Sequence, residues 1–309
     1  MSDSKKPANI RVIGVPMDLG QSRRGVDMGP SAVRYAQLQA RLERLGYHLE
    51  DCGNVVVPPV EEIEGRAKPA PSSIGYAHHL DAVVSVCESI YNTVTAGFAE
   101  GDFTIVLGGD HSISIGSVAG VAQHGPIGVI WVDAHADYNT PQTSPSGNIH
   151  GMPMAALLGD GPDALVNIGY QGPKLQPTQV VMIGIRNLDL KERLRLTNSG
   201  ITVLTMTEID ENGMAVCARK ALSQLAGFDA IHVSLDMDCL DPDIAPGVGT
   251  PVRGGFTYRE AHLLMEILAS SNKVRSMDIV EINPILDTSN QTAELAVELA
   301  ASLLGQRII

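Results

Sequence analysis

Short apolar runs alternate with segments of helical composition along most of the chain. Runs such as FTIVL, IGVIWV and VVMIGI have almost no polar positions, which is typical of strands buried on both faces of a sheet. Strands that alternate with helices usually form a parallel sheet. About eight strands can be counted, and the first helix is expected from Pro30 to about Leu45. The pattern predicts an α/β fold, either an open sheet or a (β/α)8 barrel, and periodicity does not separate the two.

Polar motifs follow five of the predicted strands. They read GGDHS (108–112), DAHAD (133–137), RNLD (186–189), DMDCLDP (236–242) and EINP (281–284). In parallel α/β folds, ligands bind outside the carboxyl ends of the strands. We therefore expect these five motifs to meet in one functional site.

Six side chains in these motifs have the chemistry of metal ligands: His111, Asp133, His135, Asp137, Asp236 and Asp238. Four carboxylates and two imidazoles without a thiolate favour Mn, or alternatively Co, Fe or Ni, over a structural Zn site. The four negative charges match two divalent ions. An extended chain would place Asp133 about 13 Å from Asp137, so we expect a bend after His135. The D-x-H-x-D motif alone could instead hold capping carboxylates, but three separate ligand motifs at three predicted strand ends argue against that alternative.

The net charge of -13 argues against a nucleic-acid partner, and no basic run is longer than Arg23-Arg24. No uncharged apolar run reaches the roughly 18 residues of a membrane span, and no signal peptide is recognised. The four cysteines are widely spaced, so buried, reduced thiols are expected. These features predict a cytoplasmic protein that binds neither nucleic acid nor membrane.

The motifs GGDHS, DAHADYN, SGNIHGMP and SLDMDCLDP together resemble the signature of the ureohydrolases, the arginase and agmatinase family. The resemblance extends to GVPMDLGQSRRGVDMGPSAVR near the start and to GTPVRGGFTYRE and VEINP late in the chain, and SGNIHGMP and VEINP are closer to arginase than to agmatinase. It implies one ureohydrolase domain over residues 1–309, with a three-layer αβα fold and an open, mainly parallel eight-stranded sheet. It also implies two Mn²⁺ per subunit and a homotrimer or homohexamer.

The same resemblance implies a role for each matching residue. One ion would be held by His111, Asp133, Asp137 and Asp236, the other by His135, Asp133, Asp236 and Asp238, with Asp133 and Asp236 bridging. His150 would transfer protons, Glu281 would pair with the substrate guanidinium, and Thr250 would lie near it. The α-carboxylate would contact Asn139, Ser144 and Ser146, and the α-amino group Asp189 and, less securely, Glu192.

The reaction so implied is hydrolysis of L-arginine to L-ornithine and urea, by attack of a metal-bridging hydroxide on the guanidinium carbon. Asp137 could protonate the departing amine, with His150 shuttling protons to water. Structural alternatives remain for the outer residues: Ser144 and Ser146 could shape a turn, and Asp189 could cap the following helix. His232 is expected to be a hydrogen-bonded core histidine.

Two positions depart from the family pattern. Asn187 stands where Asp or Ser is common, and Cys239 stands where Gly is frequent. Two other functions stay open: hydrolysis of a different guanidine, such as agmatine, and a metal-binding oligomer without turnover. The first would have no use for Asp189 as an amine-binding carboxylate, and the second is not indicated by any missing ligand.

Overall fold

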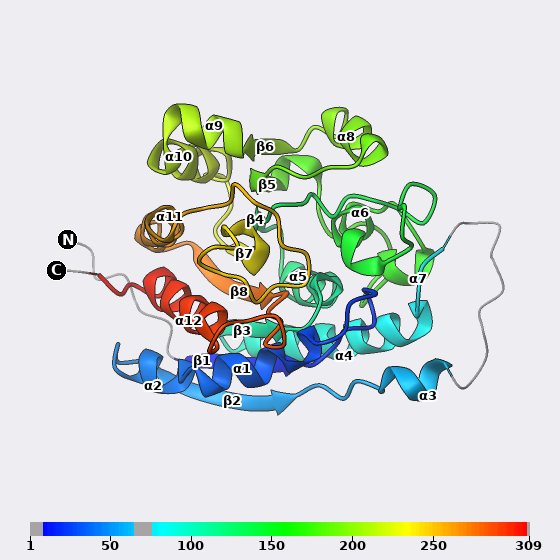
Figure 1. The fold of residues 1–309 in the computed structure, drawn as a ribbon, viewed down its shortest axis with the longest axis horizontal. Coiled ribbons are helices and arrows are strands. Elements are labelled where there is room, and N and C mark those ends of the chain that lie inside the picture. The colour runs from blue at the N-terminus through cyan, green and yellow to red at the C-terminus, as the bar shows by residue number, and fades with distance from the viewer. Residues whose placement is uncertain (1–8, 65–75, 308–309) are drawn as a thin grey trace.

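The computed structural model describes residues 9–64 and 76–307 of the chain. Its centre is a parallel sheet in the order β2-β1-β3-β8-β7-β4-β5-β6. The strands are β1 (Asn9–Val15), β2 (His48–Asn54), β3 (Phe103–Gly108), β4 (Gly128–Val132), β5 (Val180–Ile185), β6 (Thr202–Thr205), β7 (Ile231–Asp236) and β8 (Val274–Val280). Because β2 and β6 are edges, the sheet is open, as the family resemblance implied, and the barrel alternative is excluded (Figure 1).

Helices cover both faces of this sheet (Figure 1). One face packs against α1 (Gly29–Tyr35), α2 (Leu38–Glu43), α9 (Met206–Asn212), α10 (Met214–Gln224), α11 (Tyr258–Ser270) and α12 (Gln291–Leu303). The other packs against α4 (Leu80–Ala99), α5 (Ser114–Ala122), α6 (Pro153–Leu157), α7 (Asp163–Val166) and α8 (Leu190–Thr197), while α3 (Val60–Glu64) follows β2. The predicted αβα architecture is thereby confirmed.

Period-two alternation assigns the strand residues to these two layers. In β4, Ile130 and Val132 face one layer, and Val129 and Trp131 face the other. All five residues of β4 are buried, which explains why the sequence reads as a continuous apolar run.

Two predicted details were wrong. The helix expected from Pro30 to Leu45 is two helices, because Gln37 between α1 and α2 has a left-handed backbone with φ 64°. The four thiols are free, but Cys52 is exposed rather than buried, since β2 is an edge strand.

The strands that carry polar motifs are neighbours in the order β3-β8-β7-β4-β5. The helices after β3 and β4 pack on one face of the sheet, and those after β7 and β8 pack on the other. The connections therefore diverge above these strands and leave a crevice at their carboxyl ends.

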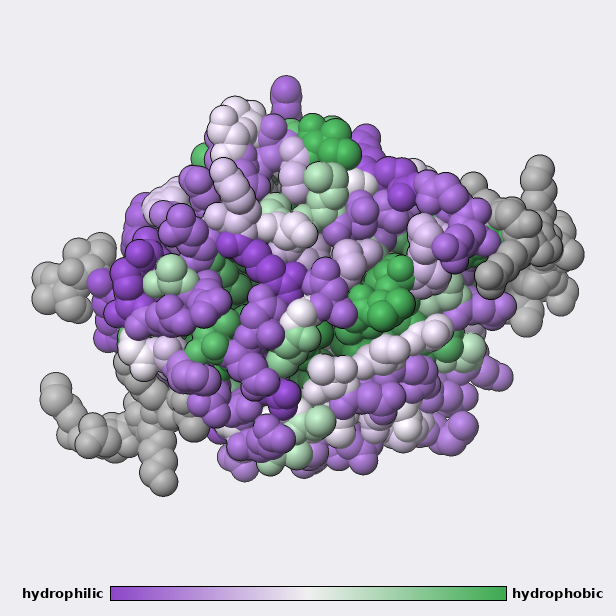
Figure 2. All heavy atoms as spheres, turned by 90° about the horizontal axis from the view of Figure 1, so that it is seen from below, coloured by the Kyte–Doolittle hydropathy of each residue, from purple (hydrophilic) through white to green (hydrophobic). Residues whose placement is uncertain are grey.

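The face viewed from below is mostly hydrophilic, with smaller apolar areas between (Figure 2). Within the described ranges, none of the helices has the length and apolar character needed to cross a membrane.

Candidate metal centre and pocket

The predicted ligands converge from three strand ends. His111 begins a short 3-10 helix after β3, and Asp133, His135 and Asp137 follow β4. Asp236 ends β7, and Asp238 lies in the 3-10 helix that follows it. Two groups of side chains have ligand atoms within 4.8 Å of one another: His111, Asp133 and Asp236, and Asp133, His135 and Asp238. Asp133 belongs to both.

His111 lies at the centre of the first group. Its Nδ1 is 3.2 Å from Asp133 Oδ2, 3.0 Å from Asp137 Oδ2 and 3.2 Å from Asp236 Oδ2. None of the described residues makes a well-directed hydrogen bond to this fully buried nitrogen. A buried nitrogen without a hydrogen-bond partner, surrounded by three oxygens, fits the donor set of a cation.

The second group surrounds His135. Its Nδ1 is 3.0 Å from Asp238 Oδ2 and 3.5 Å from Asp133 Oδ1. Asp133 thus turns one oxygen toward each imidazole, as a bridging carboxylate would. Bridging by Asp236 stays a prediction, because only its Oδ2 faces an imidazole, that of His111, while its Oδ1 accepts from the backbone N–H of Asp238 at 2.8 Å. A 3-10 helix after Asp236 sends the two carboxylates of DMD to different imidazoles.

Two residues that the sequence analysis missed orient the first group. The Trp131 indole stacks on the His111 ring at 4.0 Å between centroids, and its Nε1 donates to Asp133 Oδ2 at 2.9 Å. Ser234 Oγ lies 2.8 Å from His111 Nε2. Each residue precedes a candidate ligand by two positions, so strand alternation places it on the same face. This two-residue spacing from a candidate ligand is the sequence signal that could have identified both residues.

Without cations, the electrostatics of this cluster are unfavourable. Burial and repulsion from Asp238 and Asp133 raise the pKa of Asp236 well above its ordinary value. Burial and Asp133 likewise raise the pKa of Asp137 to about 6. Burial alone would lower the pKa of His111, but the surrounding carboxylates outweigh it and raise that pKa well above 6.5. Two divalent cations would compensate the four carboxylates.

Two site residues have a left-handed backbone although neither is glycine: Asp137, with φ 51°, and Glu281, with φ 66°. Such conformations cost on the order of 1–3 kcal/mol and concentrate at functional sites. The bend predicted after His135 is confirmed at Asp137.

Glu281 follows β8 and is fully buried beside the cluster. Its Oε1 accepts from the His111 backbone N–H at 2.9 Å and lies 3.1 Å from His150 Nδ1, while its Oε2 accepts from Gln21 Nε2 at 3.0 Å. Burial would favour the neutral acid, but His150 and His111 outweigh it and lower the pKa of Glu281. Burial would lower the pKa of His150, but Glu281 raises it to about 9.

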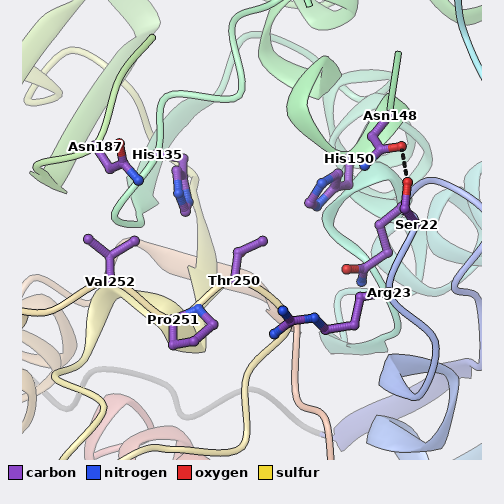
Figure 3. A pocket seen from close by; sticks show the side chains of 11 residues that line it. Ser22, Arg23, His135, Asn148, His150, Asn187, Thr250, Pro251 and Val252 are labelled. Carbon is purple, nitrogen blue, oxygen red and sulfur yellow. Dashed lines mark hydrogen bonds between the residues drawn. The ribbon is translucent and has the colours of Figure 1, made fainter. Parts of the chain in front are cut away.

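A pocket of about 420 Å³ opens onto these groups (Figure 3). His135 and His150 lie on opposite sides of it, and the guanidinium of Arg23 points toward Thr250 and Pro251. Thr250 also donates to Asp238 Oδ2 at 2.9 Å, which joins the pocket wall to the cluster. The remaining lining residues are Gln21, Ser22, Asn148, Asn187, Gly249 and Val252.

The residues predicted to hold the α-carboxylate lie beside this pocket but do not line it. Asn139 donates to Asp189 Oδ2 at 2.8 Å. Ser144 Oγ accepts from the Gly147 backbone at 2.9 Å. Ser146 Oγ accepts from the Asn148 backbone at 3.2 Å. Both serines thus form hydrogen bonds within a turn, and neither a purely structural role nor contact with a substrate is decided by them.

Asp189 and Glu192 lie at the start of α8. Asp189 caps this helix, accepting from the backbone of Lys191 at 2.9 Å and of Glu192 at 3.0 Å, as the capping alternative predicted. Glu192 is buried and accepts from the Tyr138 backbone at 2.9 Å, and burial raises its pKa to about 8. Their contact with a substrate amine also stays a prediction.

The RNLD motif serves the site through Arg186, which the sequence analysis did not single out. Its guanidinium donates to the carbonyls of Asp238 and Val252, each at 2.7 Å, and of Cys239 at 3.2 Å. Arg186 thus connects the loop that contains Asp238 to Val252, which lines the pocket. His232 is a buried histidine that contacts Ser276 at 2.8 Å, as predicted for a core residue.

Comparison with known proteins gives consistent matches over nearly the whole chain. The family model described as "Arginase family" matches residues 8–305. The arginase of Bacillus caldovelox is 51% identical over 302 residues, covering 97% of this chain and 99% of that protein. The arginase of Bacillus subtilis (strain 168) is 50% identical over 301 residues, with the same coverage. The native structure of the Bacillus caldovelox arginase superposes with a TM-score of 0.92 at 50% identity, covering 97% of this chain and 99% of that chain.

Proposed function

The chain belongs to the arginase family: it is a hydrolase that cleaves the guanidino C–N bond of arginine to give ornithine and urea, and we propose that it does so with two Mn²⁺ ions per subunit. The ligands would be His111, Asp133, His135, Asp137, Asp236 and Asp238. The observation that best supports this assignment is the pair of ligand groups joined through Asp133.

The donor set suits such ions. Four carboxylates balance the charge of two divalent cations, and oxygen-rich sites without thiolate favour Mn²⁺ over structural Zn²⁺. When bound, the ions supply a nucleophile near neutral pH, because they lower the pKa of water. Trp131 and Ser234 would keep the imidazole of His111 and the carboxylate of Asp133 in the orientation that binding requires.

Glu281 would hold the substrate guanidinium. Its lowered pKa keeps it ionised at neutral pH, and a carboxylate forms strong charge-assisted hydrogen bonds with a guanidinium. The backbone N–H of His111 fixes this carboxylate relative to the cluster. The reacting carbon would therefore lie at a set position beside the ions.

His150 and Asp137 would transfer protons. His150 Nδ1 faces Glu281, so Nε2 remains for proton exchange in the pocket. Asp137, whose Oδ2 lies 3.0 Å from His111 Nδ1, would protonate the departing amine on the cluster side.

The α-carboxylate and α-amino group of arginine would reach the residues beside the pocket, in the loop from Asn139 to Ser146 and at the start of α8. Asn139, Ser144 and Ser146 would contact the α-carboxylate, and Asp189 and Glu192 the α-amino group, with Thr250 near the guanidinium. The hydrogen bond between Asn139 and Asp189 supports the proposal that the residues for the α-carboxylate and those for the α-amino group lie side by side. We further propose a cytoplasmic homotrimer or homohexamer.

The assignment is tested by urea release from L-arginine and agmatine in parallel, using Mn²⁺-loaded protein. We expect urea from L-arginine with the higher kcat/KM. A higher kcat/KM for agmatine would show that the α-amino and α-carboxyl groups are not recognised.

A further inference from the structure

Gln21 lies between the pocket and Glu281. It is 6% exposed, belongs to the loop after β1 and lines the pocket. Its Nε2 donates to Glu281 Oε2 at 3.0 Å. Because an ionised carboxylate only accepts hydrogen bonds, this contact fixes which end of the amide faces Glu281. The carbonyl oxygen Oε1 must therefore point elsewhere.

That oxygen has no hydrogen-bond partner among residues 9–64 and 76–307, although it is buried. A buried acceptor without a donor costs about 1–3 kcal/mol. Such a group is explained by strain, by a bound water or ion, or by a catalytic or binding role, and Gln21 is distinguished by its place in the pocket. Gln21 thus presents an unused acceptor directly beside the carboxylate proposed to bind the substrate cation.

The two acceptors border one small space. A Cβ placed on Gly249, another pocket residue, would lie 2.4 Å from Glu281 Oε2 and 3.0 Å from Gln21 Oε1. Glycine leaves this space open, whereas any side chain would crowd both oxygens. A planar group with several N–H donors could reach both acceptors from here.

We propose that Gln21 is a substrate-binding residue that accepts an N–H of the guanidinium through Oε1 while Nε2 holds Glu281. This inference rests on the proposed function of Glu281. A guanidinium offers five N–H donors in one plane, which suits two adjacent acceptors. Gln21 therefore contributes selectivity for guanidines over simple amines, whose single ammonium does not span both oxygens in one plane.

The test is the Gln21→Met variant, which keeps the side-chain length and removes both hydrogen bonds. With Mn²⁺-loaded full-length protein, kcat/KM for L-arginine should fall by roughly 10- to 100-fold. Metal content and inhibition by L-ornithine, which has no guanidinium, should stay as in the wild type. Gln39→Met, an exposed glutamine on α2, is the matched control. Wild-type kcat/KM, or an equal loss of ornithine binding, would overturn the proposal.

A structure of the Mn²⁺-loaded wild type with guanidinium chloride gives a second test that needs no variant. Gln21 Oε1 should lie within hydrogen-bond distance of a guanidinium nitrogen. A guanidinium that contacts Glu281 but not Gln21 would refute the inference and leave the proposed function intact. Absence of urea release from L-arginine by the wild type would instead refute the proposed function itself.

Discussion

The backbone N–H of His111 donates to Glu281 Oε1 at 2.9 Å, although the two residues are 170 positions apart. A candidate metal ligand and the candidate guanidinium-binding carboxylate are thus joined by one hydrogen bond between the ends of β3 and β8, which are adjacent strands. Glu281 holds this contact from a left-handed backbone conformation, with φ 66°. The geometry between the candidate metal centre and the candidate guanidinium-binding carboxylate is therefore set by the sheet.

Replacing Glu281 with Gln tests this role. A charge-assisted hydrogen bond contributes about 1.5–3 kcal/mol, so we expect kcat/KM for L-arginine to fall by about 10- to 100-fold. Metal content should not change, because Glu281 is not among the candidate ligands. The variant also removes the charge that raises the pKa of His150 to about 9, so that pKa should fall. Glu43→Gln, on the surface of α2, serves as the control, and full activity of Glu281→Gln would contradict the role.

Gly249→Ala should lower kcat/KM while leaving metal binding intact. The added Cβ would lie 2.4 Å from Glu281 Oε2, so the carboxylate must move. Overpacking of this kind costs about 1–3 kcal/mol. Gly227→Ala is a matched control, because a Cβ there meets nothing within 4 Å. Steady-state kinetics equal to those of the wild type would show that the Glu281 carboxylate can shift without a loss of kcat/KM.

The fold was largely predictable because each buried strand reads as an apolar run. The order of the strands was not, since periodicity carries no information on neighbours; the family resemblance supplied the open sheet. The six candidate ligands could be predicted because histidines and carboxylates at strand ends are expensive to bury without a cation. Gln37 shows the limit of local patterns: its positive φ breaks an apolar periodicity that reads as one helix.

Arg23→Ala should raise KM for L-arginine a few-fold with little effect on kcat. Its exposed guanidinium lines the pocket and forms no ion pair with the described residues, so it can add a longer-range contact to the α-carboxylate, whose direct partners are proposed to be Asn139, Ser144 and Ser146. Exposed ion pairs contribute only about 0.2–1 kcal/mol. L-argininamide, which has no carboxylate, should show the same KM with both proteins, and Arg44→Ala is the control. An equal rise in KM for both substrates would exclude a carboxylate contact.

Glu192→Gln should change how stability depends on pH. Burial raises the pKa of Glu192 from 4.5 to about 8, so the folded state binds more protons than the unfolded state between these values. Its stabilising contribution is complete below pH 4.5 and is lost as the pH rises through about 8. The amide keeps the contact with the Tyr138 backbone, so the variant should have the higher Tm at pH 9 and a similar Tm near pH 4.5. A lower Tm at pH 9 would contradict this.

The roles of the residues predicted to contact the amino-acid end of the substrate were harder to predict than those of the candidate metal ligands, for a physical reason. Asp189, Ser144 and Ser146 can satisfy their polar groups locally, in a helix cap and in turns, and the structure has them there. Gln21 and Arg186 lie in motifs that the sequence analysis quoted, but no role was predicted for either, because a lone amide or guanidinium has no characteristic spacing. The role of each depends on a hydrogen bond to a residue far away in the sequence, Glu281 for Gln21 and Asp238 for Arg186.

The most direct test of the whole account measures bound metal and urea release in the same samples of wild type, His135→Ala and His150→Ala. We predict two Mn²⁺ per wild-type chain and urea from L-arginine. His135→Ala should bind less metal, because it removes a ligand atom 3.0 Å from Asp238. His150→Ala should keep its metal and turn over more slowly. Equal metal loss in both variants, or a fully metal-loaded wild type that releases no urea, would contradict the account.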